Sequence, residues 1–314
     1  MFENSSLCVV GNINRDVKIA PLRAGDHLLR DGESSVASIV ETIGGGGANS
    51  AFAAASLGAR VAFAGKIGGD ALGDRLQRTL TQHRIAAHLA KDDRHPSGTS
   101  IALAFDNGHR HFVSCLPANE SLRFDDIDLR ALDGAAHLLR ADVWFSKAML
   151  FGGNVELFKA AHERGVTVSL DLNWDPKWGH ADAAEITARK QAVRDVLPLV
   201  HLAHGNVREL MEFTGAPDLD TVLKRLDDWG AGAVIVHLGA QGAGFSSAGS
   251  LIVEPPAPTR SQVNTTGTGD VLSVCMMLLH HRDEIAIPER LRIANGIVAK
   301  FMEGALDLIP TLAE

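Results

Sequence analysis

Cysteine is scarce in this chain, and its few positions exclude two kinds of site. Three cysteines occur among 314 residues, at Cys8, Cys115 and Cys275, and none belongs to a Cys-x-x-Cys pair. A disulfide framework or a cysteine zinc site needs paired or closely spaced cysteines. We therefore expect three buried, free thiols in a protein of a reducing compartment.

Long apolar runs and basic blocks are also missing. No run reaches the roughly 18 apolar residues of a membrane span, and the N-terminus lacks the basic and apolar stretches of a signal peptide. The net charge is −8, and the 30 Lys and Arg residues are scattered along the chain. These features predict a cytoplasmic globular protein that binds neither nucleic acid nor a membrane surface.

What the chain has is an alternation of short apolar runs with longer amphipathic stretches. The apolar runs predict buried strands at 7–10, 61–64, 143–145, 166–170, 199–203 and 233–238. Helical patterns cover 48–57, 72–83, 155–164, 184–196, 206–213, 219–229, 270–281 and 288–303. Such alternation predicts an α/β fold with a mostly parallel central sheet and helices on both faces. The stretch 270–281 is apolar almost all round, so we expect it to be buried.

Two segments interrupt this rhythm, at about 12–43 and 98–118. They alternate in polarity instead, and Asp106-Asn107-Gly108 separates two alternating runs. Asn-Gly in that position is a strong hairpin signal. The two segments predict a small antiparallel sheet that covers a site as a lid. The predicted core then comprises residues 1–11, 44–97 and 119–314.

Glycine is concentrated at 44–47, just before Ala48, Asn49 and a helix of small residues. Glycines let the backbone approach a ligand closely, although a flexible loop ahead of a packed helix explains them equally well. The run does not fit Gly-x-Gly-x-x-Gly, and the chain has neither a P-loop nor a Gly-x-Ser-x-Gly elbow. A nicotinamide dinucleotide fold, a P-loop enzyme and a serine hydrolase are therefore disfavoured.

A second glycine pair opens the apolar helix near the C-terminus. Gly267, Thr268 and Gly269 would present backbone N–H groups at the helix start, which makes an anion hole suited to a phosphoryl group. Asp270 follows directly. It could simply cap the helix, or it could act as a general base beside the anion hole. Capping does not need two glycines in front of it, so the sequence favours the base.

Two further motifs each allow a functional and a purely structural interpretation. Asn206 and Glu209 share one helix face, and they suit either Mg²⁺ held through waters or a capping box. Residues 234–244 form a strand that runs into a glycine-rich turn. That turn could cradle a nucleotide or could be a plain hairpin.

In this order along the chain, the motifs resemble those of the ribokinase (PfkB) family of carbohydrate kinases. Residues 44–58 look like its first signature, 264–270 like its second, 206–209 like its Asn-x-x-Glu motif and 11–16 like its Gly-x-x-Asn-x-Asp segment. The resemblance implies a ribokinase-like three-layer fold with a small β-sheet lid, which also mediates a homodimer. It implies ATP and Mg²⁺ as cofactors and a sugar as substrate.

The resemblance also implies a role for individual residues. Asp270 is the base, and Gly267, Thr268 and Gly269 form the anion hole. Glu209 binds Mg²⁺ through water, together with Asn206. The sugar-binding residues are Asn14, Asp16, Gly45, Gly46, Asn49 and Asn173. The nucleotide-binding residues are Asn206, His237, Gly239, Gly242 and Asn295.

Two departures from the family pattern limit which cation and which class of sugar we expect. Asn264 replaces the first Asp of the second signature, which argues against activation by K⁺. Asp175 stands where fructokinase-like members carry Arg, which argues against a phosphorylated or carboxylated sugar. We therefore expect transfer of the γ-phosphoryl group of ATP to a hydroxyl of a neutral pentose or hexose. The alternatives are a nucleoside kinase of the same fold and a non-catalytic sensor that binds sugar or nucleotide.

Overall fold

The computed structural model describes residues 2–3, 5–261 and 266–312. Its main sheet has nine strands in the order β13-β12-β11-β10-β9-β8-β1-β4-β5. Seven of them run parallel, whereas β12 and β13 form an antiparallel edge. The bounds are β1 Ser6–Val10, β4 Arg60–Gly68, β5 Ala86–Asp92, β8 His137–Arg140, β9 Thr167–Asp171, β10 Leu202–Asn206, β11 Ala233–His237, β12 Ala243–Ser247 and β13 Ser250–Glu254.

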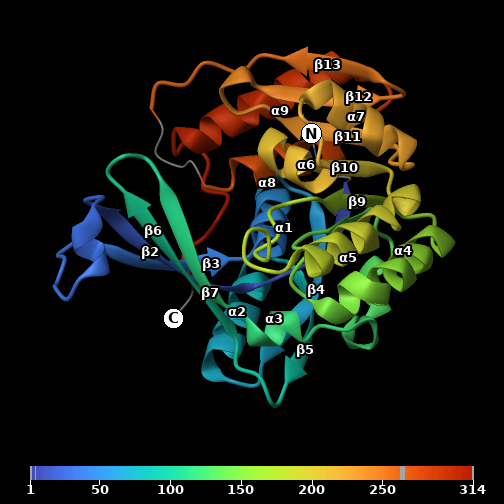
Figure 1. Ribbon diagram of the computed structural model, residues 1–314. Coiled ribbons are helices and arrows are strands. Elements are labelled where there is room, and N and C mark those ends of the chain that lie inside the picture. Colours follow the sequence, from blue (N-terminus) through green and yellow to red (C-terminus); the bar gives the residue numbers. More distant parts are fainter. Residues whose placement is uncertain (1, 4, 262–265, 313–314) are drawn as a thin grey trace.

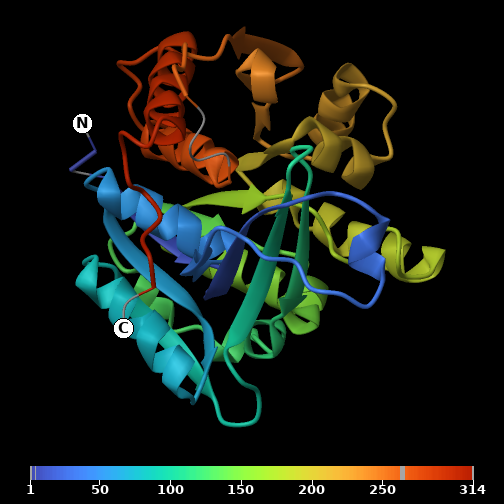
Figure 2. The same ribbon diagram turned by 90° about the vertical axis from the view of Figure 1, so that its left-hand side faces the viewer.

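Helices cover both faces of this sheet, as Figures 1 and 2 show. One apolar core joins the sheet to α1 Gly46–Ser56, α2 Ala71–Gln82, α8 Thr268–Leu278 and α9 Ile287–Met302. The other joins the opposite face to α4 Asn154–Glu163, α5 Ala183–Arg194, α6 Val207–Thr214 and α7 Leu219–Asp228. The predicted three-layer α/β architecture is confirmed. Helix α8 is buried from Val271 to Leu278, also as predicted from its apolar surface.

A separate four-stranded sheet projects from the core (Figure 1), and we call it the lid. Its order is β3-β2-β6-β7, with β2 Asn14–Leu22, β3 Ile39–Gly44, β6 Gly98–Phe105 and β7 Arg110–Cys115. The predicted hairpin between β6 and β7 is present. The prediction of a purely antiparallel lid is wrong, because β2 and β6 pair in parallel. Both strands leave the same edge of the core, after β1 and β5, and therefore run in the same direction.

Three local predictions are also wrong. Residues 143–145 form a buried turn, and the strand lies earlier, at His137–Arg140. That strand was missed because its two ends are polar, although Arg140 is buried and bonded to the side chain of Asn154. The strand expected at 199–203 begins only at Leu202. Cys115 is exposed on β7, whereas Cys8 and Cys275 are buried free thiols.

One short helix connects the lid to the core. Helix α3, Pro117–Glu120, follows β7, and the side chain of Asn119 donates a hydrogen bond to the Ile13 carbonyl at 3.0 Å. Near the C-terminus, Thr311 forms an antiparallel bridge with Thr42 of β3. Among the described helices, none has the length and apolar character required to cross a membrane.

Candidate active site

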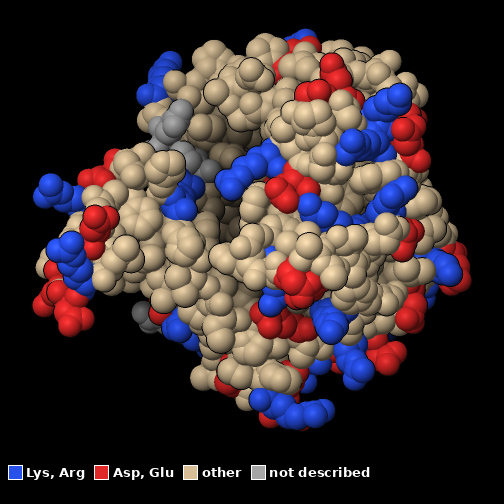
Figure 3. Space-filling model, in the orientation of Figure 1, with Lys and Arg blue, Asp and Glu red and all other residues tan. Residues whose placement is uncertain are grey.

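The carboxyl ends of the central parallel strands meet at one edge of the main sheet, beneath the lid. Ligands of open α/β sheets bind in the crevice at this edge. The residues that follow β1, β8, β9, β10 and β11 carry most of the predicted site, and α1 and α8 begin here. Figure 3 shows a hollow between the lid and the core, with Lys and Arg side chains at both of its rims.

Asp270 lies in the first turn of α8, within hydrogen-bond reach of the glycine-rich loop. Helix α8 begins after Gly267, whose φ of 88° is in the left-handed region, and no side chain caps it. The Asp270 carboxylate instead accepts a hydrogen bond from Asn49 at 3.3 Å. The capping alternative is therefore wrong. Because Asp270 is half-buried and polar, it faces a site and not the apolar core that surrounds the rest of α8.

The environment of Asp270 raises its pKa to about 7. Burial is the largest cause, and the nearby negative charge of Asp142 adds to it, while the hydrogen bond from Asn49 opposes both. A general base works best when its pKa lies near the operating pH. The backbone N–H groups of the first helical turn lie beside this carboxylate. The arrangement can thus accept a proton and stabilise negative charge at neighbouring points.

The glycine-rich loop between β3 and α1 is tightly packed, which argues against the reading as a merely flexible loop. A Cβ atom on Gly44 would lie 1.9 Å from the carboxylate of Asp16, and one on Gly45 would lie 2.4 Å from the carbonyl of Asn12. Gly45 also has a φ of 95°. Only glycine fits this approach. Asp16 accepts a hydrogen bond from Asn14 at 2.8 Å, and burial raises its pKa to about 6.

Asp142 organises this loop, and sequence reasoning missed it. It follows β8 with a φ of 54° and is buried. Its carboxylate accepts hydrogen bonds from the backbone N–H groups of Asn12 at 2.9 Å, Gly46 at 3.1 Å and Gly47 at 2.8 Å. An acidic residue two positions after the end of a parallel strand is the signal that could have revealed it. The strand was expected at 143–145, so Asp142 stood before the expected strand instead of after one and was not recognised as a site residue.

Two amide side chains of the site have unsatisfied oxygens. Asn49 Oδ1 and Asn173 Oδ1 are buried and have no hydrogen-bond partner among the described residues. The other end of each amide is engaged, by Asp270 and by Asp142 respectively. Buried polar atoms are nearly always paired in native proteins. These two oxygens therefore indicate a ligand that donates hydrogen bonds, as sugar hydroxyl groups do.

The carboxylates at this edge repel one another, and this repulsion suits a divalent cation. The pKa of Asp171 is well above its usual range, first because of burial and then because of Glu209, Asp270 and Asp142. A bound Mg²⁺ ion would relieve this repulsion. No three His, Cys, Asp or Glu side chains of the described residues converge as metal ligands. Since Mg²⁺ usually keeps several waters and binds substrate phosphates, the residues fit a water-mediated site.

Asn206 and Glu209 form a reciprocal capping box, which was one of the two interpretations of this motif beside water-mediated Mg²⁺ binding. The Asn206 side chain accepts from the Glu209 N–H at 2.9 Å, and Glu209 Oε2 accepts from the Asn206 N–H at 2.8 Å. Burial raises the pKa of Glu209. The capping box does not exclude the magnesium role, because it orients a half-buried carboxylate at the edge where Asp171 and Asp270 lie.

A cleft of about 590 Å³ lies between the β11–β12 turn and helices α8 and α9. Of the predicted nucleotide-binding residues, its lining includes His237, Gly239, Gly242 and Asn295, together with Thr268 and Gly269 of the predicted anion hole. Asn206 does not line it. Asn295 also donates to the carbonyls of Glu254 at 3.1 Å and Pro255 at 2.8 Å, which ties α9 to the end of β13. The cleft has the size and apolar character of a small-molecule site.

Asp175 does not act as the sequence suggested. It is fully buried and forms a two-point ion pair with Arg189, with distances of 2.6 and 2.9 Å. Its charge is therefore compensated inside the core and does not face a sugar. The argument against acidic sugars that was drawn from Asp175 fails. Asn264, on which the expectation about K⁺ depends, lies outside the described residues.

Comparison with known families identifies the chain. The profile described as "pfkB family carbohydrate kinase" matches residues 4–277. The chain belongs to this family. It is 27% identical over 292 residues to a probable fructokinase-4 of Arabidopsis thaliana, with 88% of this chain and 86% of that protein covered. It is 26% identical over 282 residues to a ribokinase of the same plant, with 85% of this chain and 68% of that protein covered.

Solved structures share the fold of this carbohydrate kinase. A putative Ribokinase II from E. coli in complex with ATP and Mg²⁺ superimposes with a TM-score of 0.78 at 17% identity, covering 96% of each chain. Arabidopsis thaliana ribokinase complexed with ribose and ATP gives a TM-score of 0.72 at 22% identity, covering 95% of this chain and 93% of that one. The ribokinase-like fold predicted from the motifs is thus confirmed.

Proposed function

We propose that this carbohydrate kinase transfers the γ-phosphoryl group of ATP to a hydroxyl of a neutral pentose or hexose, with Asp270 as the general base. One observation carries the proposal. A half-buried carboxylate whose pKa is raised to about 7 lies in the first turn of α8, beside the backbone N–H groups of the helix start, which no side chain caps. This pairing supports proton removal and charge stabilisation in the same step.

The sugar would lie under the lid, on the buried polar side chains of the site. Asp16 accepts hydrogen bonds from its hydroxyls, and the free oxygens of Asn49 and Asn173 accept others. Asn14 orients Asp16, and the backbone of Gly45 and Gly46 closes over the ligand. Residues 12–43 and 98–118 serve as the lid in this proposal. Covering the sugar excludes water, which limits hydrolysis of ATP.

ATP would occupy the cleft between the β11–β12 turn and α9, with its phosphates directed at Gly267, Thr268 and Gly269. Asp270 takes the proton of the attacking hydroxyl, and the backbone amides of α8 stabilise the transferring group. Glu209, oriented by Asn206, would hold Mg²⁺ through water. When bound, Mg²⁺ supplies positive charge to the phosphate oxygens. The relatives known as complexes with ATP support this choice of donor.

A panel of neutral sugars, sugar acids, sugar phosphates and nucleosides tests the proposal through sugar-dependent ADP formation. We expect turnover with a neutral pentose or hexose. Turnover confined to nucleosides would instead identify a nucleoside kinase of this fold. Tight sugar binding without turnover of any acceptor would identify a non-catalytic sensor and would refute the enzymatic proposal.

We further propose that two copies associate through their lids. The outer face of the lid exposes Ile39 by 62%, Ile101 by 37% and Val113 by 53%. Ile101 and Val113 are paired directly across β6 and β7. A second lid would cover this apolar face. Sedimentation should show a dimer for the wild type and a monomer for Ile101→Lys, and a wild-type monomer would contradict the proposal.

We also propose that the enzyme is cytoplasmic. Cys8 and Cys275 are buried free thiols, which fits a reducing compartment.

A further inference from the structure

The nucleotide cleft lacks the positive charge that a triphosphate calls for. Its described lining consists of glycines, apolar side chains, threonines, Asn295 and His237, without any Lys or Arg. Burial lowers the pKa of His237 to about 4, so this imidazole is neutral near pH 7. Asp270 directly follows Gly269 of this lining, and the negative charges of Asp142 and Glu209 act on it. Any positive charge that the protein adds to that of Mg²⁺ must therefore come from outside this cleft.

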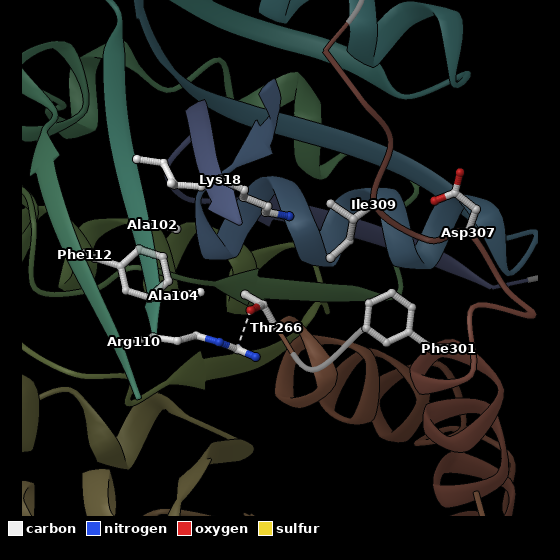
Figure 4. Close-up of a pocket in the computed structure, with 10 residues that line it drawn as sticks. Lys18, Ala102, Ala104, Arg110, Phe112, Thr266, Phe301, Asp307 and Ile309 are labelled. Atoms are coloured by element: carbon white, nitrogen blue, oxygen red, sulfur yellow. Dashed lines mark hydrogen bonds between the residues drawn. The ribbon is translucent and has the colours of Figure 1, made fainter. Parts of the chain in front are cut away.

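The inner face of the lid carries two cations. Lys18 lies two residues after Asp16 on β2, so both side chains point to the same face of the lid. Lys18 pairs with Ala102, and Ala104 on the same face of β6 pairs with Arg110 of β7. Figure 4 shows Lys18 and Arg110 directed from the lid into a cavity of about 200 Å³. The opposite wall of this cavity includes Thr266 and the C-terminal segment.

Arg110 already reaches the edge of the anion hole. Its Nη1 atom donates a hydrogen bond to Thr266 Oγ1 at 2.5 Å, and Thr266 directly precedes Gly267. Lys18 is half-buried, and its pKa is lowered chiefly by burial and further by the charge of Arg110, while Asp16 opposes both. Asp307 also lines this cavity, and Figure 4 shows it farther from the two cations than Ile309. The cavity thus concentrates positive charge between the sugar-binding Asp16 and the start of α8.

We propose that Lys18 and Arg110 are catalytic residues that bind the phosphoryl group while it passes from ATP to the sugar. This inference rests on the proposed kinase function. In that step the sugar oxygen forms a bond to the γ-phosphorus, the bond from this phosphorus to the β–γ bridging oxygen breaks, and Asp270 takes the hydroxyl proton. ADP leaves with the electron pair of the broken bond. Oxygens of the transferring group receive hydrogen bonds from the two lid cations.

Placing these charges on the lid couples chemistry to sugar binding. The core supplies backbone amides and a base, whereas the lid supplies the positive charge on the same face as Asp16, which would bind the sugar. Interactions that exist only in the closed, occupied site lower the barrier without tightening the binding of ATP alone. The lid would then suppress phosphoryl transfer to water through its charge as well as by covering the site.

Kinetics of Lys18→Met, Arg110→Met and Arg110→Lys test the roles against a matched control. Arg23→Met removes an exposed lid charge just beyond β2 and outside the cavity. We expect kcat for the sugar to fall roughly 10- to 1,000-fold in the two Met variants, with KM for ATP within about twofold of wild type. Arg110→Lys should recover part of the loss. Rates equal to that of Arg23→Met would overturn the proposal.

A binding measurement tests the same point without turnover. Calorimetry would compare the affinity for ADP and Mg²⁺ with that for ADP, Mg²⁺ and aluminium fluoride, a mimic of the transferring group, with sugar present. The Met variants should lose about tenfold or more of the extra affinity conferred by the fluoride. The control should retain it. Retention in every variant would overturn the inference.

The outcomes separate this inference from the proposed function. An active wild type with unaffected Met variants removes only the role of the lid cations. A wild type inactive with every acceptor removes the kinase function, while the fluoride measurement still decides whether the cations hold a phosphoryl group. Variants impaired only with sugar acids or sugar phosphates would show that the cations recognise a charged acceptor, which also overturns the inference.

Discussion

The two halves of the site, which we propose bind the sugar and the nucleotide, use different chemistry. The proposed sugar half is built from buried and half-buried polar side chains, among which Asp16, Asp142 and Asp270 each accept a hydrogen bond at 2.8 to 3.3 Å. The nucleotide half is an apolar cleft shaped by glycines such as Gly239 and by helix ends. A buried polar network depends on every partner, because each unpaired group costs free energy. An apolar cleft tolerates change better, so the two halves should respond differently to mutation.

The largest expected effect is on the base of the sugar half. Asp270→Asn removes the proton acceptor while keeping the size of the side chain, so we expect kcat to fall by about 10²- to 10⁴-fold. Binding of ATP, for which we propose the other half, should change by less than about threefold. Rapid-quench kinetics and calorimetry measure the two quantities. A variant with a near-normal rate would remove Asp270 from the mechanism.

Matched glycine substitutions compare the halves directly. Gly45→Ala places a Cβ atom 2.4 Å from the Asn12 carbonyl at a φ of 95°, so the loop must move. A displacement of about 1 Å in a site can cost about 100-fold in rate. Gly239 has a φ of 58°, and a Cβ atom added there by Gly239→Ala would meet no atom within 4 Å. We expect it to cost only about 1–2 kcal/mol of stability. Equal losses in kcat/KM for the sugar would contradict the contrast.

Asp142→Asn should have an intermediate effect on the sugar half alone. The amide can accept from only some of the three backbone N–H groups that the carboxylate now serves. Leaving one buried donor unpaired costs about 1–3 kcal/mol. We expect KM for the sugar to rise about tenfold with KM for ATP unchanged. A parallel rise in both constants would indicate that Asp142 supports the whole fold.

The smallest effects concern pH. Because the base must be deprotonated, kcat/KM for the sugar should rise about tenfold per pH unit up to about pH 7 and then level off. Stability without ligands should move in the opposite direction. The folded-state pKa of Asp270 is raised to about 7, so its contribution to stability is complete below about pH 4, the unfolded value, and is lost as the pH rises through 7.

Urea unfolding at pH 5, 6 and 7 measures this second effect. The free energy of unfolding of the wild type should fall with pH more steeply than that of Asp270→Asn, which cannot titrate at this position. Asp16, whose pKa is raised to about 6, contributes the same trend in both proteins. Parallel curves for the two proteins would show that Asp270 is not buried enough for its charge to matter.

Most of the correct predictions came from short local motifs. The Asn107-Gly108 turn, the glycines at 44–47 and the polar start of an apolar helix each reflect backbone rules that act within a few residues. They were sufficient to predict the lid hairpin and the ribokinase-like fold. Asp270 at the anion hole was singled out for the same reason, and its role as base stays a prediction.

What was missed depends on contacts between distant segments. The pairing of Asp175 with Arg189 brings a helix to a loop 14 residues away and removes a charge that the sequence seemed to offer the site. Strand β8 escaped notice because Arg140 is polar, although its partners on other elements make it buried. Asp142 was hidden by the same misplaced strand.

The sequence by itself determined the α/β alternation, the two glycine-rich turns and the acidic residue beside the second one, because period and turn chemistry are local properties of a chain. Only the tertiary structure decided which charges are neutralised and which are left facing a cavity. It alone placed Lys18 and Arg110 of the lid in a cavity with Thr266, close in sequence to Thr268 and Gly269 of the cleft proposed for the nucleotide, whose described lining lacks Lys and Arg. Electrostatic energy depends on distances in space and on burial, and both arise from segments far apart in the chain.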